Sequence, residues 1–265
     1  MSTRRRRPPA LVAVAAAVGL LLFALPLVGL LQRADWSHLL TDLRSPASTE
    51  AMRLSVTTSL LATALAIALG LPLAWVLART DLPGRAALRA LVLLPMVLPP
   101  VVGGVALLSA FSRRSPLGSW LFDAFGIQLT FSRAGVVLAE TFVAMPFFVI
   151  TVEAALRGLD VRYEQVAAGL GAGPGQVFRR VTLPLIAPAV AAGALLSWAR
   201  ALGEFGATIT FAGNVAGRTR TLPLAVYLQL ESDPAGAVAL SLVLLAISFV
   251  VLVALRDRWL GGARR

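Results

Sequence analysis

The chain has 265 residues, of which 58% are hydrophobic and only 14% are charged, and its mean hydropathy is +0.82. Soluble domains usually carry about 25% charged residues, so this composition excludes an ordinary soluble domain and indicates an integral membrane protein. The chain contains no cysteine, which excludes disulfides and thiolate metal or redox chemistry. Its net charge is +11, and all 24 basic residues are arginines.

Long apolar stretches dominate the chain from its N-terminal end onward. Four arginines at positions 4–7 precede an uncharged stretch that is longer than the core of about 7–15 residues in a cleaved signal peptide, so this stretch is predicted to be a retained span. A span needs about 20 predominantly apolar residues. The sequence therefore predicts six transmembrane helices in a single domain over residues 1–265, at 10–31, 54–77, 90–111, 134–156, 185–211 and 237–255. Because strand-like alternation is absent, the predicted fold is all-α.

Arginines are distributed unequally between the two sides of these spans. The termini and the second and fourth connections carry 15 arginines, whereas the opposite connections carry 8. The positive-inside rule therefore predicts a multi-pass protein of the cell membrane with both termini in the cytoplasm. Topology accounts for the arginine excess, so the lipid bilayer is the expected environment and no nucleic acid is expected as a partner.

Prolines and glycines interrupt several predicted spans. Pro72 follows Gly70 in the second span, Pro146 lies in the fourth, and the third contains Pro95, Pro99, Pro100, Gly103 and Gly104. Interior prolines free backbone carbonyls, which are tolerated at membrane depth only where protein or a water-filled path satisfies them. Such broken spans are typical of transporters, although kinked helices also arise from packing alone.

The connection at 160–188 is a polar segment between two spans. A short helix is predicted here, because apolar residues recur at helical spacing and a Pro-Gly pair follows. Small residues occupy the neighbouring positions Ala168, Gly169, Gly171 and Ala172, so another protein could approach the backbone closely. The apolar face consists of Tyr163, Val166, Ala167 and Leu170. This cytoplasmic segment is therefore predicted to dock a protein that lies outside the membrane.

Ionisable residues within the spans are costly and indicate function by default. Arg200 and Glu204 are i, i+4 neighbours in the fifth span, so they either neutralise each other or act in transport. Glu153 lies near the cytoplasmic end of the fourth span. Glu140 has no local partner and is expected to find one on another helix or subunit.

Small and hydroxylated residues surround Glu204. Gly203 and Gly206 remove side-chain bulk beside it, and Thr208 and Thr210 add hydroxyl groups. Such residues allow close helix packing and can line a passage for an oxyanion. The predicted translocation pathway or gate therefore comprises Glu140, Arg200, Gly203, Glu204, Gly206, Thr208 and Thr210.

Several catalytic signatures are absent. The chain has no G-x-x-x-x-G-K-[ST] phosphate loop and no lysine to build one, and it lacks a nucleophile elbow, an H-E-x-x-H motif and a dinucleotide fingerprint. No catalytic residue, metal site or cofactor is therefore expected, and ATP-driven transport would require an ATPase on another polypeptide. A secondary transporter or channel that uses Glu140 and Glu204 as proton or cation sites is the alternative of a different class.

The polar connection resembles the EAA motif of ABC importer permeases through Glu164, Ala167, Ala168, Gly171 and the pair Leu183-Pro184. In that family this segment, here 160–176 between spans 4 and 5, forms the coupling helix that fits a groove in the ATP-binding subunit. The resemblance implies that Tyr163, Glu164, Ala167, Ala168 and Gly171 contact the ATPase. The spacing departs from the family pattern, because Gln165 and Val166 separate the glutamate from the alanines.

Further segments look like the molybdate and sulfate branch of these permeases: 71–80, 98–104, 139–147 and 201–208. Residues 211–227 look like the molybdate members in particular. The resemblance implies the permease subunit of a molybdate or tungstate importer that works by alternating access. Its implied partners are a second copy of the chain in a homodimer, ABC ATP-binding subunits and an extracytoplasmic molybdate-binding protein. Sulfate or thiosulfate is the alternative substrate, and the outer arginines expected to draw in anions are Arg113, Arg114, Arg218 and Arg220.

Overall fold

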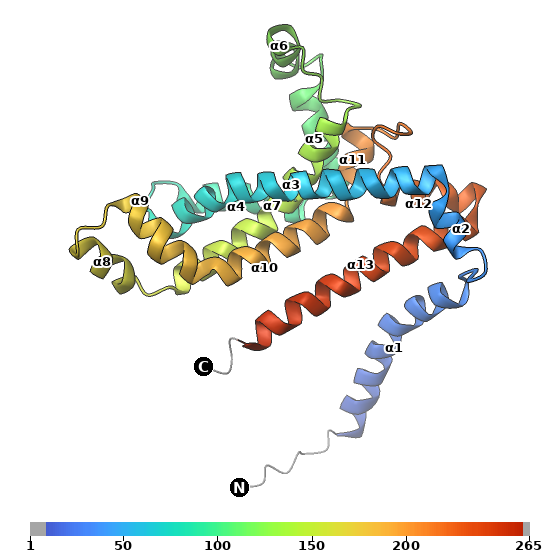
Figure 1. The fold of residues 1–265 in the computed structure, drawn as a ribbon, viewed down its shortest axis with the longest axis horizontal. Coiled ribbons are helices and arrows are strands. Elements are labelled where there is room, and N and C mark those ends of the chain that lie inside the picture. Colours follow the sequence, from blue (N-terminus) through green and yellow to red (C-terminus); the bar gives the residue numbers. More distant parts are fainter. Residues whose placement is uncertain (1–8, 262–265) are drawn as a thin grey trace.

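The computed structural model describes residues 9–261, with side chains through residue 254, and these residues form only helices and connections (Figure 1). The predicted all-α fold class is therefore confirmed. The arginines at 4–7, 264 and 265, which contribute to the predicted orientation, lie outside the described residues.

Five helical runs are long and apolar enough to cross a membrane. They are α1 (Ala10–Gln32), α3 (Pro46–Arg79), α7 (Arg133–Gly158), the run of α9 (Pro174–Val177), η1 (Phe178–Thr182) and α10 (Leu183–Leu202), and α13 (Pro234–Gly261). The pair α4 (Arg85–Val97) and α5 (Pro100–Phe111) passes the same test jointly but is bent by 118°. The described residues therefore contain five continuous candidate spans and one bent pair.

The long helix α7 lies at the centre of the bundle, where it packs against α3, α10, α4, α11 and α5. Phe148, Val152 and Leu156 are fully buried and pack in one cluster with Leu77 of α3. Gly70 brings α3 close to α7, because a Cβ atom there would lie 2.8 Å from a ring carbon of Phe148. Close approach at small residues is the usual way in which membrane helices associate.

The interruptions fall at fewer places than the sequence predicted. Pro72 and Pro146 lie inside the unbroken helices α3 and α7, so the expected breaks there are wrong. A proline removes one backbone hydrogen bond, and packing between these two helices keeps each of them continuous. The stretch 90–111 is divided at Leu98 and Pro99, whose backbones are extended as expected before and at prolines.

A second division falls within the predicted span 185–211. The helix α10 ends at Leu202, and α11 (Gly206–Phe211) begins after three residues outside the helices. The sequence analysis noted the glycines around this point but predicted one continuous helix. Glycine lowers helix stability in the interior of a helix, and Gly203 occupies the C-terminal cap position of α10.

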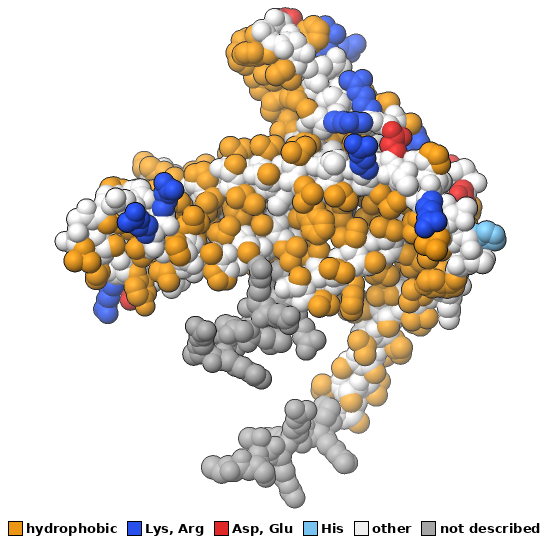
Figure 2. Space-filling model, in the orientation of Figure 1, with side chains coloured by type: hydrophobic (Ala, Val, Ile, Leu, Met, Phe, Trp, Pro, Cys, Tyr) orange, Lys and Arg blue, Asp and Glu red, His pale blue; other side chains and the backbone are white. Residues whose placement is uncertain are grey.

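Shorter helices occupy the ends of the bundle and a projecting arm. The arm consists of α5 and α6 (Pro116–Phe125), and it points away from the bundle axis (Figure 1). One end of the bundle carries α2 (Leu39–Arg44) and α12 (Leu222–Ser232), and the other carries α8 (Arg162–Gly169). Hydrophobic side chains cover much of the bundle surface, whereas arginines gather near its ends and at the base of the arm (Figure 2). This distribution fits a multi-pass membrane protein.

Candidate functional site

The short helix α8 presents apolar side chains at the end of the bundle. Tyr163 is 58% exposed, Val166 64% and Leu170 85%. Ala168 and Gly171 are also exposed, whereas Ala167 is half-buried. These side chains form an uncovered hydrophobic surface at the end of the bundle, and such a surface is typical of a protein contact site.

The end of α8 explains the glycine that follows it. Gly171 has a φ of +90°. Its N–H donates to the carbonyl of Ala168 at 2.9 Å, and the N–H of Ala172 donates to the carbonyl of Ala167 at 3.1 Å. These bonds satisfy the last carbonyls of the helix in the pattern of a Schellman motif, for which glycine is favoured because positive φ disfavours a Cβ atom.

Glu164 faces the bundle and not the exposed side of α8. Its Oε1 accepts a hydrogen bond from the hydroxyl of Thr182 at 2.8 Å and lies 3.4 Å from Nη2 of Arg79. The Glu164 side chain is only 17% exposed. This carboxylate therefore ties α8 to η1 and to the end of α3, while the exposed residues of α8 remain open to a partner.

A different pair of charges stabilises the junction between α10 and α11. Glu204 is 1% exposed, and its Oε2 lies 2.6 Å from Nη2 of Arg200. Its Oε1 accepts a hydrogen bond from the N–H of Ala207 at 2.8 Å. Glu204 therefore neutralises Arg200 within one chain and also satisfies a free backbone donor at the start of α11.

Glycines bring α11 into backbone contact with α5. A Cβ atom at Gly206 would lie 2.8 Å from Cβ of Pro100, and one at Gly104 would lie 2.9 Å from the carbonyl oxygen of Ala207. Gly203 is different, because a Cβ atom there would meet only the carbonyl oxygen of Ala199, at 3.7 Å. Gly206 and Gly104 therefore hold the two helices together, whereas Gly203 only ends α10.

The two threonines of α11 point into contacts within the protein. Thr208 is fully buried, and its hydroxyl has no hydrogen-bond partner within the described part of the chain. The hydroxyl of Thr210 donates to the carbonyl of Gly206 at 2.8 Å. Neither residue lines the cavity described below, and their role in a pathway stays a prediction.

Glu140 finds its partner on another helix. The hydroxyl of Thr58 in α3 donates to its Oε1 at 2.9 Å, across 82 positions of sequence. Glu140 is 1% exposed, and its Oε2 has no hydrogen-bond partner among the residues that the structure describes. A buried carboxylate with one unsatisfied oxygen is energetically costly and is a candidate functional group.

Glu153 is neutralised near the end of the bundle that carries α8. Its Oε1 lies 2.8 Å from Nη2 of Arg157, and its Oε2 lies 3.3 Å from Nε of Arg89 on α4. The side chain is 1% exposed, so this carboxylate ties α4 to α7. No group of three or more His, Cys, Asp or Glu that could hold a metal occurs in the described portion of the chain.

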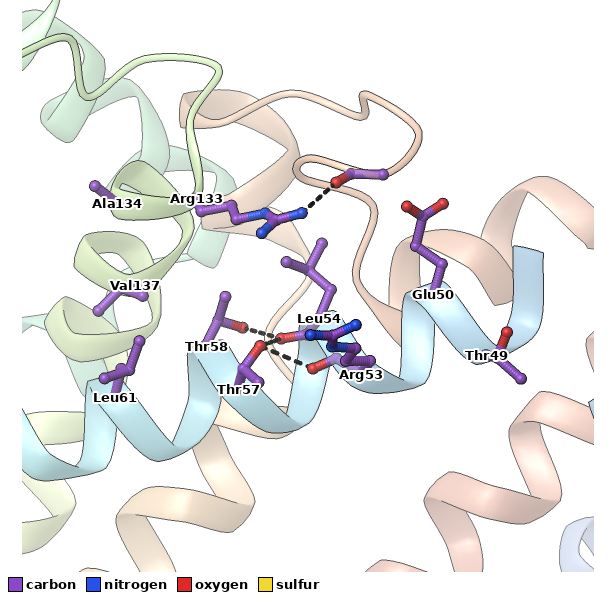
Figure 3. Close-up of a pocket in the computed structure, with 11 residues that line it drawn as sticks. Thr49, Glu50, Arg53, Leu54, Thr57, Thr58, Leu61, Arg133, Ala134 and Val137 are labelled. Atoms are coloured by element: carbon purple, nitrogen blue, oxygen red, sulfur yellow. Dashed lines mark hydrogen bonds between the residues drawn. The ribbon is translucent and has the colours of Figure 1, made fainter. Parts of the chain in front are cut away.

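The sequence analysis missed a cavity at the opposite end of α7 from α8. It measures about 790 Å³ and is lined in part by Glu50, Arg53, Thr57, Thr58, Arg133 and Gly217 (Figure 3). Arg53 and Arg133 entered the sequence analysis only as connection arginines. One signal could have indicated their environment: Arg133, Val137 and Glu140 recur at i, i+4 and i+7, on one face of α7.

Comparisons with known proteins agree with this architecture. A family described as "Binding-protein-dependent transport system inner membrane component" matches residues 66–260. The "Molybdenum transport system permease protein ModB" of Mycobacterium bovis is 50% identical over 250 residues, which are 94% of this chain and 94% of that protein. The protein of the same name from Escherichia coli K12 is 42% identical over 216 residues, or 82% of this chain and 94% of that one. A solved bacterial alginate ABC transporter chain, 20% identical, has a TM-score of 0.74 and covers 92% of this chain and 91% of its own.

Proposed function

Because this chain belongs to the family of binding-protein-dependent transport system inner membrane components, we propose that it is the membrane-spanning permease subunit of an ATP-driven molybdate importer. The observation that carries the substrate is the 50% identity, over 94% of the chain, to a relative named for molybdenum transport. Tungstate is a similar tetrahedral dianion and fits the same proposal. Sulfate or thiosulfate is less supported, because the Escherichia coli K12 relative named for sulfate transport is 38% identical, below the 50% and 42% of the two relatives named for molybdenum.

The permease is not an enzyme, and ATP hydrolysis belongs to a separate ABC subunit. The chain has no phosphate loop with which to bind ATP. We assign α8 as the coupling helix, because Tyr163, Val166 and Leu170 leave an apolar face uncovered. Glu164 would transmit the motion of α8 to the bundle through its contacts with Arg79 and Thr182.

A second copy of the chain completes the pathway in this proposal. The arm formed by α5 and α6 projects from the bundle and exposes Val101, Val105 and Trp120 by 53%, 49% and 55%. The helix α1 also has no buried residue along its length. Two copies that cover each other's arms would enclose a passage between them, and the junction of α10 and α11 with Gly203, Gly206, Thr208 and Thr210 would lie at or near its gate.

The orientation follows the arginine distribution and is part of the proposal. The end with α8 would face the cytoplasm together with both termini, and the end with α2 and α12 would face the extracytoplasmic binding protein. Alternating access would then connect these two ends in turn, with ATP binding and hydrolysis acting on α8.

Reconstitution tests the proposed class directly. The chain, its ATPase subunits and its binding protein are incorporated into liposomes. Uptake of labelled molybdate is then measured with ATP supplied on the side of the membrane that carries the ATPase. We expect the ATPase to co-purify and uptake to require ATP. Uptake driven by a proton or cation gradient without any ATPase would instead identify a secondary transporter that uses Glu140 and Glu204.

A further inference from the structure

A cavity of about 790 Å³ lies between α3, the start of α7 and the connection at residues 213–221. Arg53 lies on α3 and Arg133 at the first position of α7, and their side chains reach the same space (Figure 3). The cavity lies at the far end of α7 from α8, which is the end proposed above to face the binding protein.

The guanidinium groups in this cavity retain most of their hydrogen-bonding capacity. The side chain of Arg53 makes no hydrogen bond or ion pair with the residues that the structure describes, although it lies one turn from Glu50. Arg133 uses Nη2 to donate to the carbonyl of Gly217 at 2.8 Å. Each guanidinium carries five N–H donors, so several donors point into the cavity without a partner of their own.

The other polar groups of the cavity favour a ligand that is rich in hydrogen-bond acceptors. The Thr57 hydroxyl already donates to the carbonyls of Arg53 and Leu54, at 2.8 and 2.9 Å. Glu50 is the only carboxylate among the lining residues, so the arginines outnumber it. A cation would be repelled by the excess positive charge, and a neutral solute would leave the donors unused. An anion with several acceptor oxygens uses them, as Arg does with oxyanions generally.

One lining hydroxyl of the cavity is already engaged by a buried carboxyl group. Thr58 lines the cavity, and its hydroxyl donates to the buried carboxyl of Glu140 at 2.9 Å. An anion would therefore be held by Arg53 and Arg133 and not by the hydroxyl of Thr58. The volume leaves room for part of the hydration shell, so binding would be weak enough for release, which transport requires.

We propose that Arg53 and Arg133 form an entry site for a tetrahedral oxyanion. The anion occupies this site before it reaches the passage between the two copies. In the proposed importer, on which this inference rests, the occupant is molybdate that the binding protein has released. The two arginines bind the anion through their free N–H donors.

Equilibrium binding to the complete transporter tests the site. The permease with its ATPase subunits is placed in nanodiscs without the binding protein, and labelled molybdate and labelled sulfate are titrated separately. We expect about a fivefold loss of affinity in R53Q and in R133Q, which is the upper end for an exposed ion pair, and about a 25-fold loss in the double variant if the two effects add. R33Q and R44Q are the matched controls, because both arginines are exposed near the same end and line no part of this cavity.

The results separate this site from the proposed substrate. Affinity losses for sulfate alone would support the oxyanion site and contradict the molybdate assignment. Equal affinities in the double variant and the unaltered chain, equal losses in R33Q or R44Q, or no binding of either anion to the unaltered chain would each overturn the entry site.

Discussion

The contact between α5 and α11 makes Gly104 sensitive to substitution by alanine. A Cβ atom at Gly104 would lie 2.6 Å from Cβ of Thr210, 2.9 Å from the carbonyl oxygen of Ala207 and 3.0 Å from its Cα. Carbon atoms pack at about 3.5–4.0 Å, so the shortfall is about 1 Å against atoms that cannot rotate away. Overpacking of this kind costs about 1–3 kcal/mol. We therefore expect G104A to push α5 away from α11 and to destabilise the permease by that amount.

Gly203 provides the matched control for this substitution. Its added Cβ would meet only the Ala199 carbonyl at 3.7 Å, an ordinary contact, and its φ of −88° is accessible to alanine. Both variants are measured by equilibrium unfolding in mixed micelles, with molybdate uptake recorded in parallel. We expect G203A to change the free energy of unfolding by less than about 0.5 kcal/mol. Equal stability of G104A and G203A would refute the close packing of α5 on α11.

Three further substitutions test α8 and the one histidine. E164A removes the acceptor for Arg79 and Thr182, and hydrogen bonds to charged groups contribute about 1.5–3 kcal/mol. We therefore expect uptake per ATP hydrolysed to fall about tenfold while the ATPase still co-purifies. Unchanged coupling would contradict the assigned role of Glu164. A168W should abolish co-purification of the ATPase because Ala168 is exposed on α8, whereas A86W on α4 should not; retention of the ATPase by A168W would contradict docking at α8. The hydrogen bond that the His38 ring donates to Asp35, and then the charge of Asp35, raise the pKa of His38 above its ordinary value. The pair is therefore ordered below this raised pKa, and the order is lost as pH rises through it. Because the chain has one histidine, its ring resonance can be titrated without ambiguity, and D35N should lower its pKa; an unchanged pKa would show that the two side chains are not paired.

The sequence predicted the features that depend on local composition. Apolar stretches of sufficient length indicated the spans, and the Pro99-Pro100 pair lies where α4 and α5 separate, because successive prolines force extended backbone. Pro72 and Pro146 have the same local chemistry but lie in continuous helices. Whether a proline breaks a helix there depends on packing between helices, which the local sequence does not contain.

In the candidate site, too, the sequence predicted local features but not the contacts that depend on packing between helices. The spacing of Arg200 and Glu204 allowed a pair within one helix face, and the structure places them 2.6 Å apart. The partner of Glu140 could not be identified, because Thr58 is 82 positions away in sequence. The inward direction of Glu164 and the shared cavity of Arg53 and Arg133 likewise arise only when separate helices pack together.

Uptake by whole cells tests the proposed function most directly. A strain that lacks its molybdate permease receives this chain together with its ATPase and binding protein, and uptake of labelled molybdate and labelled sulfate is measured with the A168W variant as the uncoupled control. We expect molybdate uptake to be restored, to exceed sulfate uptake and to disappear in A168W. Restored uptake of sulfate alone, or molybdate uptake that persists when the ATPase is omitted, would contradict the assignment of this chain as the permease subunit of an ATP-driven molybdate importer.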